Sequence, residues 1–243
     1  MGADPTSPNP RYHLCMPGAG TRLPLVPLPN VVHFPRTELK LHVTDPAFQP
    51  LVQELEGQDE DERWLGVVLL KPGPRFDAQG RPEIFPGGTA ARVMDLETQS
   101  DGNTDLLLYG ELRFELEREI VDAPYRQAVV RLKEEPWLDE RDAGILAVRN
   151  DLLKQLRNLS KDLGEQFPWD LDDLEALSGG AAFEELVNRI ATRMEVPPLR
   201  KLQLLTESLP ERGLSVLSIL RARRQVFDLL RPFRRLAGNA EHN

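Results

Sequence analysis

The sequence predicts an α+β protein in which a β-rich N-terminal part is followed by an all-helical part. Apolar residues between positions 21 and 137 alternate or form short runs, and clusters of Pro and Gly separate these segments. From about residue 138 the apolar spacing changes to three and four, the period of amphipathic helices. We expect a disordered tail over 1–20, a small barrel or folded sheet over 21–137, a helical bundle over 138–237 and a tail over 238–243.

Six or seven short strands and one short helix are expected in the first part. Leu39, Leu41 and Val43 alternate with polar residues, which indicates a half-buried strand, whereas the apolar run 63–70 suits burial on both faces. Asp45 followed by Pro46 predicts a helix N-terminus. Residues 100–103, Ser-Asp-Gly-Asn, separate two further strands and predict a hairpin turn. Residues 125–135 give another strand.

About five helices are expected in the second part. The first has an apolar stripe from Ile145 to Leu163, and a short one ends at the glycine pair 179–180. A third spans 183–194, a fourth follows the proline pair 197–198, and the last begins at Pro210. Such a succession of amphipathic helices predicts a bundle.

Composition restricts the function classes. The 243 residues carry a formal net charge of −9, which disfavours binding to nucleic-acid phosphates. Cys15 is the single cysteine, so a disulfide framework and a multi-cysteine metal site are excluded. The N-terminus has no signal-peptide pattern, and no apolar run is long enough to span a membrane. We therefore expect a cytoplasmic protein with no membrane partner.

Residues 23–43, LPLVPLPNVVHFPRTELKLHV, resemble the start of the Lon protease N-terminal domain. That family opens with Leu-Pro-x-x-Pro-Leu, then Val-Val-x-Phe-Pro, and usually has a glycine next, where this chain has Arg36. Five later segments resemble the family in the same order, so the resemblance covers about residues 22–231. The matching residues of the opening segment are Leu23, Pro24, Pro27, Leu28, Val31, Val32, Phe34, Pro35 and Leu41.

The resemblance implies a PUA-like β-barrel or folded-sheet subdomain followed by a helical bundle, and a substrate-binding role. Within these 243 residues there is no Gly-x-x-x-x-Gly-Lys-Ser/Thr phosphate loop and no segment resembling the Ser–Lys protease site. We therefore expect a stand-alone, non-catalytic module that binds unfolded or partly folded proteins, as an adaptor or regulator of proteolysis, with a protease as a further candidate partner. Prolines in the first strand would fit a strand at an open sheet edge.

Catalytic chemistry has no support in the sequence. The four histidines are scattered, and neither a metal-binding nor a nucleophile motif is present. A hydrolase built from carboxylates or His33 is the alternative, without a positive signal. We expect no enzyme activity, no cofactor and no metal.

Four aromatic residues are candidates for contact with polypeptide. Loops on a rigid scaffold commonly present such anchors, but each ring could instead cover the core beneath its own loop. The candidates are Phe34, Phe76, Phe85 and Trp137.

A second candidate surface is the Arg-rich final helix. It could bind an anionic partner, and a PUA-like nucleic-acid-binding protein is therefore the alternative function. A solvated helix end is the simpler interpretation, and pairing with acidic residues of the bundle is another. The candidates are Arg221, Arg224, Arg231 and Arg235. The acidic run from Glu54 to Glu62 is interpreted as a solvated loop, or else a dock for a basic partner.

Overall fold

The computed structural model describes residues 20–77, 80–121, 123–164, 167 and 171–238, with residues 171–172 and 231–238 described for their backbone alone. The predicted tails, apart from Gly20 and Gly238, lie outside these ranges. The chain divides into two compact units, each described separately below. One comprises the chain up to Glu134 together with Val196–Leu205, and the other comprises Glu135–Glu195 and the chain from Thr206. The predicted division, 21–137 and 138–237, assigns residues 196–205 to the helical bundle, whereas the structure groups them with the β-rich unit.

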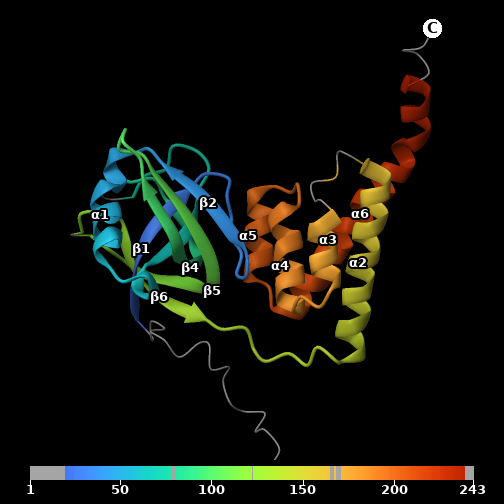
Figure 1. Ribbon diagram of the computed structural model, residues 1–243, viewed down its shortest axis with the longest axis horizontal. Helices are drawn as coiled ribbons and strands as arrows, with labels where there is room; N and C mark the ends of the chain where they lie inside the picture. Colours follow the sequence, from blue (N-terminus) through green and yellow to red (C-terminus); the bar gives the residue numbers. More distant parts are fainter. Residues whose placement is uncertain (1–19, 78–79, 122, 165–166, 168–170, 239–243) are drawn as a thin grey trace, which may run out of the picture. The chain divides into compact units, whose positions relative to one another are not determined.

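Six strands form one mixed sheet in the first unit (Figure 1). Their order is β2-β5-β4-β3-β1-β6, and β5 also pairs with β6, so that five strands follow one another around a closed circuit. Only β1 and β3 run parallel. The strands are β1 (Thr21–Leu28), β2 (Glu38–Val43), β3 (Trp64–Leu70), β4 (Ile84–Thr98), β5 (Thr104–Ile120) and β6 (Gln127–Lys133).

The proline-rich first strand is not at an edge, which corrects the expectation from its sequence. β1 pairs with β6 over its first half and with β3 over its second half. Pro24 lies at the last β1–β6 pair, before the first β1–β3 pair at Leu25. The Leu25 N–H donates to the carbonyl of Arg126, the residue before β6. Backbone nitrogens two residues apart in a strand point to the same side, so the Pro27 nitrogen also faces the β6 side, but beyond the last β1–β6 pair. The change of partner therefore accommodates both prolines.

Two apolar clusters lie on the two faces of the sheet. Burial of β3 on both faces confirms the prediction from its apolar run: Val67 belongs to one cluster and Val68 to the other. The first cluster also holds Leu51 and Leu55 of helix α1 (Gln49–Gly57). In the second, the Phe114 ring packs closely against the backbones of β3 and β4, where Gly66 and Gly88 leave room for it. Two local predictions for this unit are confirmed: Asp45 caps η2 (Pro46–Phe48), and a hairpin turn joins β4 to β5. The short helix η3 (Glu60–Glu62) was not predicted.

The helices of the C-terminal part fall in both units. The second unit contains α2 (Ala143–Leu163), α3 (Leu171–Ser178), α4 (Phe183–Arg193) and α6 (Leu209–Gly238). The remaining helix, α5 (Pro198–Thr206), lies almost entirely in the first unit. The five helices match the predicted number within the described residues. One contact that holds α5 to the sheet is the hydrogen bond from Arg113 Nη1 of β5 to the Leu205 carbonyl, 2.9 Å long.

α2 and α6 lie side by side and run in the same direction. The position of Gly213 is close to Val148, Arg221 pairs with Asp151 at 2.5 Å, and residues near the end of α2 share a pocket with Arg223. α6 therefore continues beyond the end of α2, as Figure 1 shows. In this last part of α6, the side chains of Val226, Leu229 and Leu230 are exposed among the residues that the structure describes.

Candidate functional site: a proline-lined pocket

A pocket of about 480 Å³ opens in the β-rich unit where the parallel strands β1 and β3 end. Its volume is in the range of sites that hold peptide side chains or small molecules. The pocket is formed by three segments that are distant in sequence: the turn after β1, the end of β3 with its following loop, and the start of α5. The lining residues are Pro29, Asn30, Leu69, Leu70, Lys71, Pro72, Gly73, Pro82, Pro197, Pro198 and Leu199.

Proline supplies much of the wall. A proline ring is apolar and its backbone is already fixed in φ, so a proline wall loses little conformational freedom when a ligand binds. Asn30 and Gly73 adopt positive φ angles, 63° and 89°, which turn the chain sharply at two points of the rim. Leu199, in the first turn of α5, remains 47% exposed. The result is a preformed apolar recess with an open side.

Ion pairs hold the loop between β3 and β4 in place. Lys71 Nζ lies 3.0 Å from Glu83 Oε2, and Arg126 Nη1 donates to the Pro82 carbonyl at 2.6 Å. Arg126 and Arg81 both bond the Glu119 carboxylate, at 2.8 and 2.9 Å. Because Arg126 is largely buried, these charge-assisted bonds are shielded from water and fix the Pro82 wall.

Phe76 lies beside this pocket. It forms an isolated antiparallel bridge with Pro82, one of the lining residues, and its side chain is 58% exposed. A large exposed aromatic side chain on a residue whose backbone pairs with a pocket residue is a candidate contact for apolar ligands.

The other predicted polypeptide contacts do not join Phe76 at the pocket. Phe34 is fully buried, which corrects its prediction as a surface residue: its turn packs against Gly110, and Thr37 Oγ1 donates to its carbonyl at 2.7 Å. Phe85 is half-buried in β4 and does not line the pocket. Trp137 is 83% exposed but belongs to the second unit.

The predicted arginine surface is partly occupied by ion pairs within its own unit. Arg221 pairs with Asp151 at 2.5 Å, and Arg224 lies 3.9 Å from Asp228. This fits the interpretation that these cations pair with acidic residues of the bundle. Arg231 and Arg235 lie in α6, in the part described for its backbone alone.

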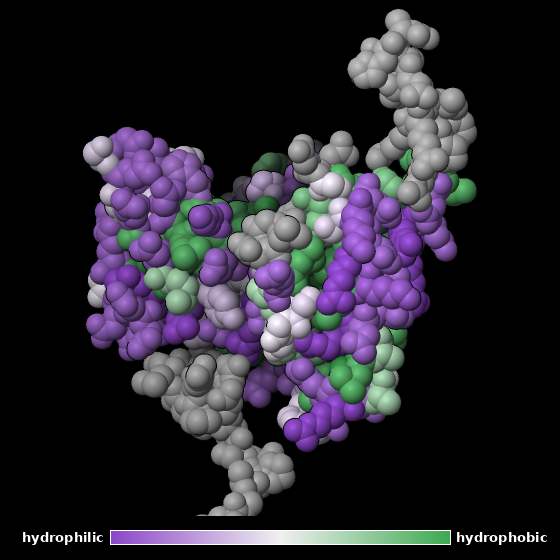
Figure 2. Space-filling view, turned by 45° about the vertical axis from the view of Figure 1, so that its right-hand side comes forward, coloured by the Kyte–Doolittle hydropathy of each residue, from purple (hydrophilic) through white to green (hydrophobic). Residues whose placement is uncertain are grey.

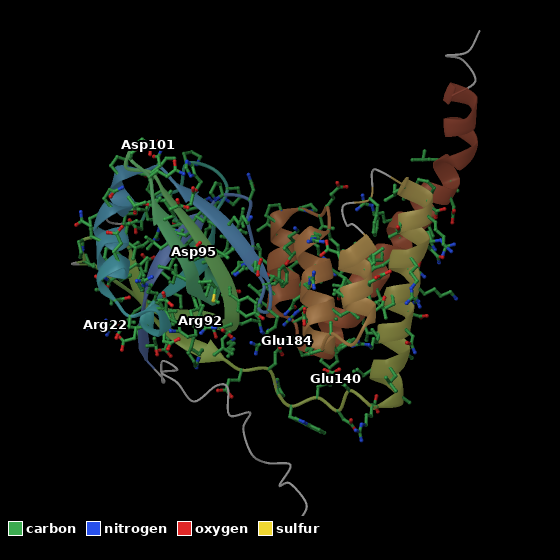
Figure 3. All side chains as sticks on the ribbon, in the orientation of Figure 1. Arg22, Arg92, Asp95, Asp101, Glu140 and Glu184 are labelled. Atoms are coloured by element: carbon green, nitrogen blue, oxygen red, sulfur yellow. The ribbon has the colours of Figure 1, made fainter. Side chains whose placement is uncertain are left out.

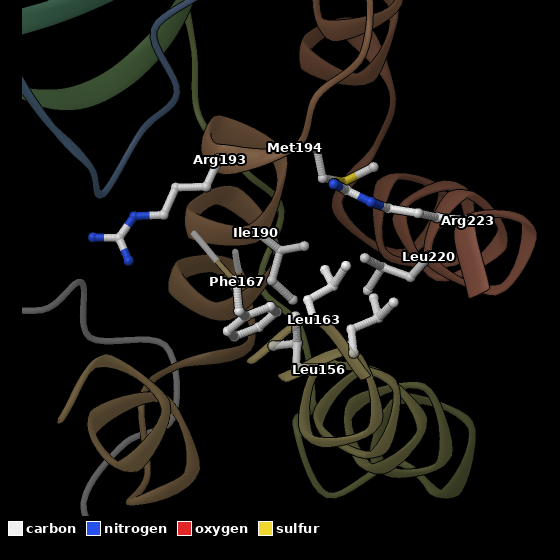
Figure 4. A pocket seen from close by; sticks show the side chains of 9 residues that line it. Leu156, Leu163, Phe167, Ile190, Arg193, Met194, Leu220 and Arg223 are labelled. Carbon is white, nitrogen blue, oxygen red and sulfur yellow. The ribbon is translucent and has the colours of Figure 1, made fainter. Parts of the chain in front are cut away.

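A second, smaller pocket lies among α2, α4 and α6. Figure 4 shows apolar side chains converging on it, while Arg193 points away. Arg193 pairs with Asp173 and Arg223 with Glu195. Since the apolar groups nearly fill this space, we regard it as part of the packing of the bundle.

The residues that form the proline-lined pocket were missed by sequence reasoning. Clusters of Pro and Gly were recognised as separators of the strands, and the proline pair 197–198 as a break before a helix, but nothing in these local patterns shows that the segments meet. Among the described residues, no cluster of three or more His, Cys, Asp or Glu side chains could hold a metal ion. Within the same described part of the chain, we find no helix with the length and apolar character of a membrane span.

Comparison with known proteins identifies the family. Residues 22–222 match the model of the ATP-dependent protease La (LON) substrate-binding domain, and the chain belongs to this family. It is 29% identical over 210 residues to a Lon protease of Anaeromyxobacter dehalogenans and 27% identical over 208 residues to Lon protease 2 of Myxococcus xanthus. Each alignment covers 85% of this chain and 24% of the relative, so the chain spans about a quarter of these proteases.

Solved structures of the same domain share the fold. A crystal structure of a Lon N-terminal domain protein from Xanthomonas campestris has 24% sequence identity and a TM-score of 0.56, over 82% of this chain and 98% of that one. The N-terminal domain of the Mycobacterium avium complex Lon protease has 13% identity and a TM-score of 0.57, over 83% and 98% of the two chains. The resemblance deduced from the opening segment is thereby confirmed, and the α+β class with a helical C-terminal part is confirmed with it.

Proposed function

We propose that this chain binds unfolded or loosely folded segments of other proteins through the proline-lined pocket and Phe76, without catalysing a reaction itself. The observation that carries the proposal is the exposed Phe76 next to a preformed apolar pocket, in a member of a substrate-binding family. We also propose that the closed circuit of strands is a PUA-like pseudo-barrel that serves as its rigid support.

The physical basis of selection would be the exposure of apolar side chains. A folded client buries these groups in its own core, whereas an unfolded segment offers them for burial at about 25 cal/mol per Å². One pocket and one ring bury only a small area, so the affinity of a single site is expected to be modest. Such binding suits a module that has to release its clients.

The test is fluorescence anisotropy of a labelled, permanently unfolded protein titrated with this chain. We expect saturable binding of the unfolded protein and none of a folded control. Phe76→Ala and Leu199→Ala should each weaken binding about tenfold, equivalent to about 1.4 kcal/mol. Met94→Ala is the matched control, because Met94 is a 50% exposed apolar residue of the same unit that does not line the pocket. Equal affinity of all three variants and the native chain would contradict the proposed site.

We further infer that the module acts in proteolysis as an adaptor or regulator. An unfolded client degraded by a Lon protease should be degraded faster in the presence of an adaptor and more slowly in the presence of a competitor. An unchanged rate with the native chain, at concentrations that saturate the client, would contradict a role in proteolysis.

A further inference from the structure

The strand β2 lies outside the closed circuit of the sheet. It pairs with β5 on one side, and among the described strands it is the one without a second partner. In Figure 3 the hairpin of β4 and β5 ends at Asp101, and β2 (blue) lies on its β5 side. A strand with one partner leaves the backbone groups of its other edge without bonds from the sheet.

Three residues direct their backbone groups to this open edge. The Gly110 N–H donates to the Thr37 carbonyl at 2.9 Å, so the Thr37 carbonyl faces β5. Because the direction of the backbone groups alternates along a strand, the N–H and C=O groups of Glu38, Lys40 and His42 face away from β5. Their side chains are exposed as well. The edge therefore offers a regular series of donors and acceptors to a further strand.

The apolar core is incompletely covered along the same edge. Leu39 and Leu41 face the first apolar cluster but remain half-buried. Their partners in β5, Leu108 and Leu106, are only 0% and 3% exposed. Figure 2 shows that hydrophobic residues reach the surface of the β-rich unit among hydrophilic ones. A strand added beside β2 would cover Leu39 and Leu41 with its own apolar side chains, and this burial favours its binding.

Charge indicates which polar side chains such a strand would carry. On the outer face, His42 Nδ1 lies 2.6 Å from Oδ1 of Asp105, its cross-strand neighbour in β5. Lys40 lies opposite Leu107, and within the described residues no carboxylate pairs with its ammonium group. An acidic side chain opposite Lys40 on the added strand would supply the missing partner.

We propose that the open edge of β2 binds an extended segment of an unfolded client as an additional antiparallel strand. The segment alternates apolar residues, packed beside Leu39 and Leu41, with polar ones, and carries an acidic residue opposite Lys40. This second site rests on the proposed function, because its ligand is the same kind of client, but it binds main-chain groups where the pocket binds side chains. A folded client has already paired these groups within its own structure, so both sites select unfolded segments.

A short acetylated and labelled peptide, Thr-Val-Thr-Val-Glu-Val-Thr, tests the bonding pattern by fluorescence anisotropy. Residues that bond each other in an antiparallel pair have their side chains on the same face, so the Thr and Glu nitrogens should face β2 and the Val nitrogens should face water. Methylating the Thr and Glu nitrogens should weaken binding at least about tenfold, whereas methylating the Val nitrogens should change it less than about twofold. Equal binding of the two methylated peptides would overturn the proposal, and so would a native chain that binds no peptide.

Two substitutions at one position separate the backbone donor from the charge. Lys40→Pro removes an N–H that faces away from β5, so the bonds between β2 and β5 stay intact, and proline is tolerated at such an edge position. Lys40→Thr keeps the N–H and removes the charge alone. We expect peptide binding to weaken at least about tenfold with Lys40→Pro and about threefold with Lys40→Thr. Circular dichroism should report the same strand content for both variants, and equal affinities of the two would overturn strand addition.

The β2 edge and the pocket can fail independently in these experiments. Phe76→Ala should weaken binding of the unfolded protein and leave binding of the peptide unchanged. If Phe76→Ala has this effect but the two methylated peptides bind equally, the β2 site is wrong and the pocket stands. If the peptide is lost only in Lys40→Pro while Phe76→Ala binds the unfolded protein like the native chain, the pocket is wrong and the β2 site stands.

Discussion

Buried polar side chains at single positions connect segments that are far apart in the sequence. Arg212 is fully buried and donates to Asn188 Oδ1 and Glu135 Oε1, both at 2.6 Å, and to the Glu207 carbonyl at 3.0 Å. It therefore joins the linker before α2, the interior of α4 and the turn before α6. A guanidinium is suited to this position because its fork of donors can satisfy several acceptors at once.

Replacing Arg212 should be costly. Arg212→Ala removes the guanidinium and leaves the Glu135 carboxylate without its cation in a poorly hydrated place, and we expect a loss of about 3–5 kcal/mol in the free energy of unfolding. Urea unfolding of the variant measures this loss. Arg221→Ala is the control, since its ion pair is exposed and should contribute less than about 1 kcal/mol. Similar stabilities of the two variants would contradict the importance of the buried network.

His33 should make stability depend on pH. Its imidazole is 3% exposed, and burial lowers its pKa from 6.5 to about 4. As the pH falls below 6.5, the unfolded chain binds a proton that the folded chain does not, so stability falls with pH and levels off below about 4. We expect a loss of about 2 kcal/mol between pH 7 and pH 5, measured by urea unfolding. His33→Gln should flatten this slope; an equal slope in the variant would assign it to other groups.

At the level of single elements, the turn between β1 and β2 packs tightly on β5. Arg36 N–H donates to the Gly110 carbonyl at 2.8 Å, and the Gly110 N–H donates to the Thr37 carbonyl at 2.9 Å. Arg36 itself has a φ of 60°, the left-handed conformation that glycine adopts most easily. Its guanidinium lies 2.9 Å from Glu111, which offsets part of the cost of this conformation.

Gly110 should tolerate no side chain. A Cβ at this position would lie 2.4 Å from the Phe34 carbonyl oxygen, so Gly110→Ala must move the turn or the strand. We expect a loss of more than about 2 kcal/mol in the free energy of unfolding. Gly57→Ala, at the end of α1, is the control because nothing lies within 4 Å of its added methyl group, and it should be neutral within about 1 kcal/mol. Equal effects of the two substitutions would contradict the close approach.

Local patterns predicted the elements well and their partners less well. The apolar run of β3, the Asp45 cap and the turn at Gly102 depend on neighbouring residues, so the sequence revealed them. The central place of β1 and the burial of Phe34 depend on strands distant in sequence, and their signals were misinterpreted. For the site, Phe76 was recognised as a candidate contact, but Pro82, with which it pairs, lines one pocket with Pro197 to Leu199, a long-range arrangement that no local pattern encodes.

For the whole molecule, the negative net charge disfavours nucleic acid as a partner. The net charge is −9, and the described arginines Arg221, Arg223 and Arg224 each have a carboxylate within 4 Å. We expect no saturable binding of a short single-stranded RNA at about 150 mM salt, measured by anisotropy beside the unfolded protein. RNA binding that decreases steeply with salt, and decreases again in an Arg221→Ala/Arg224→Ala variant, would instead support the alternative function.

The return of residues 196–205 to the β-rich unit has a consequence for how the protein is made. All six strands leave the ribosome before the helices of the second unit, yet Pro197, Pro198 and Leu199 form one wall of the pocket. Folding during synthesis can therefore complete the sheet while its pocket still lacks a wall. A nascent chain arrested after Glu134 would carry Phe76 but not the finished pocket, and the pocket would be completed only once most of the helical part has been synthesised.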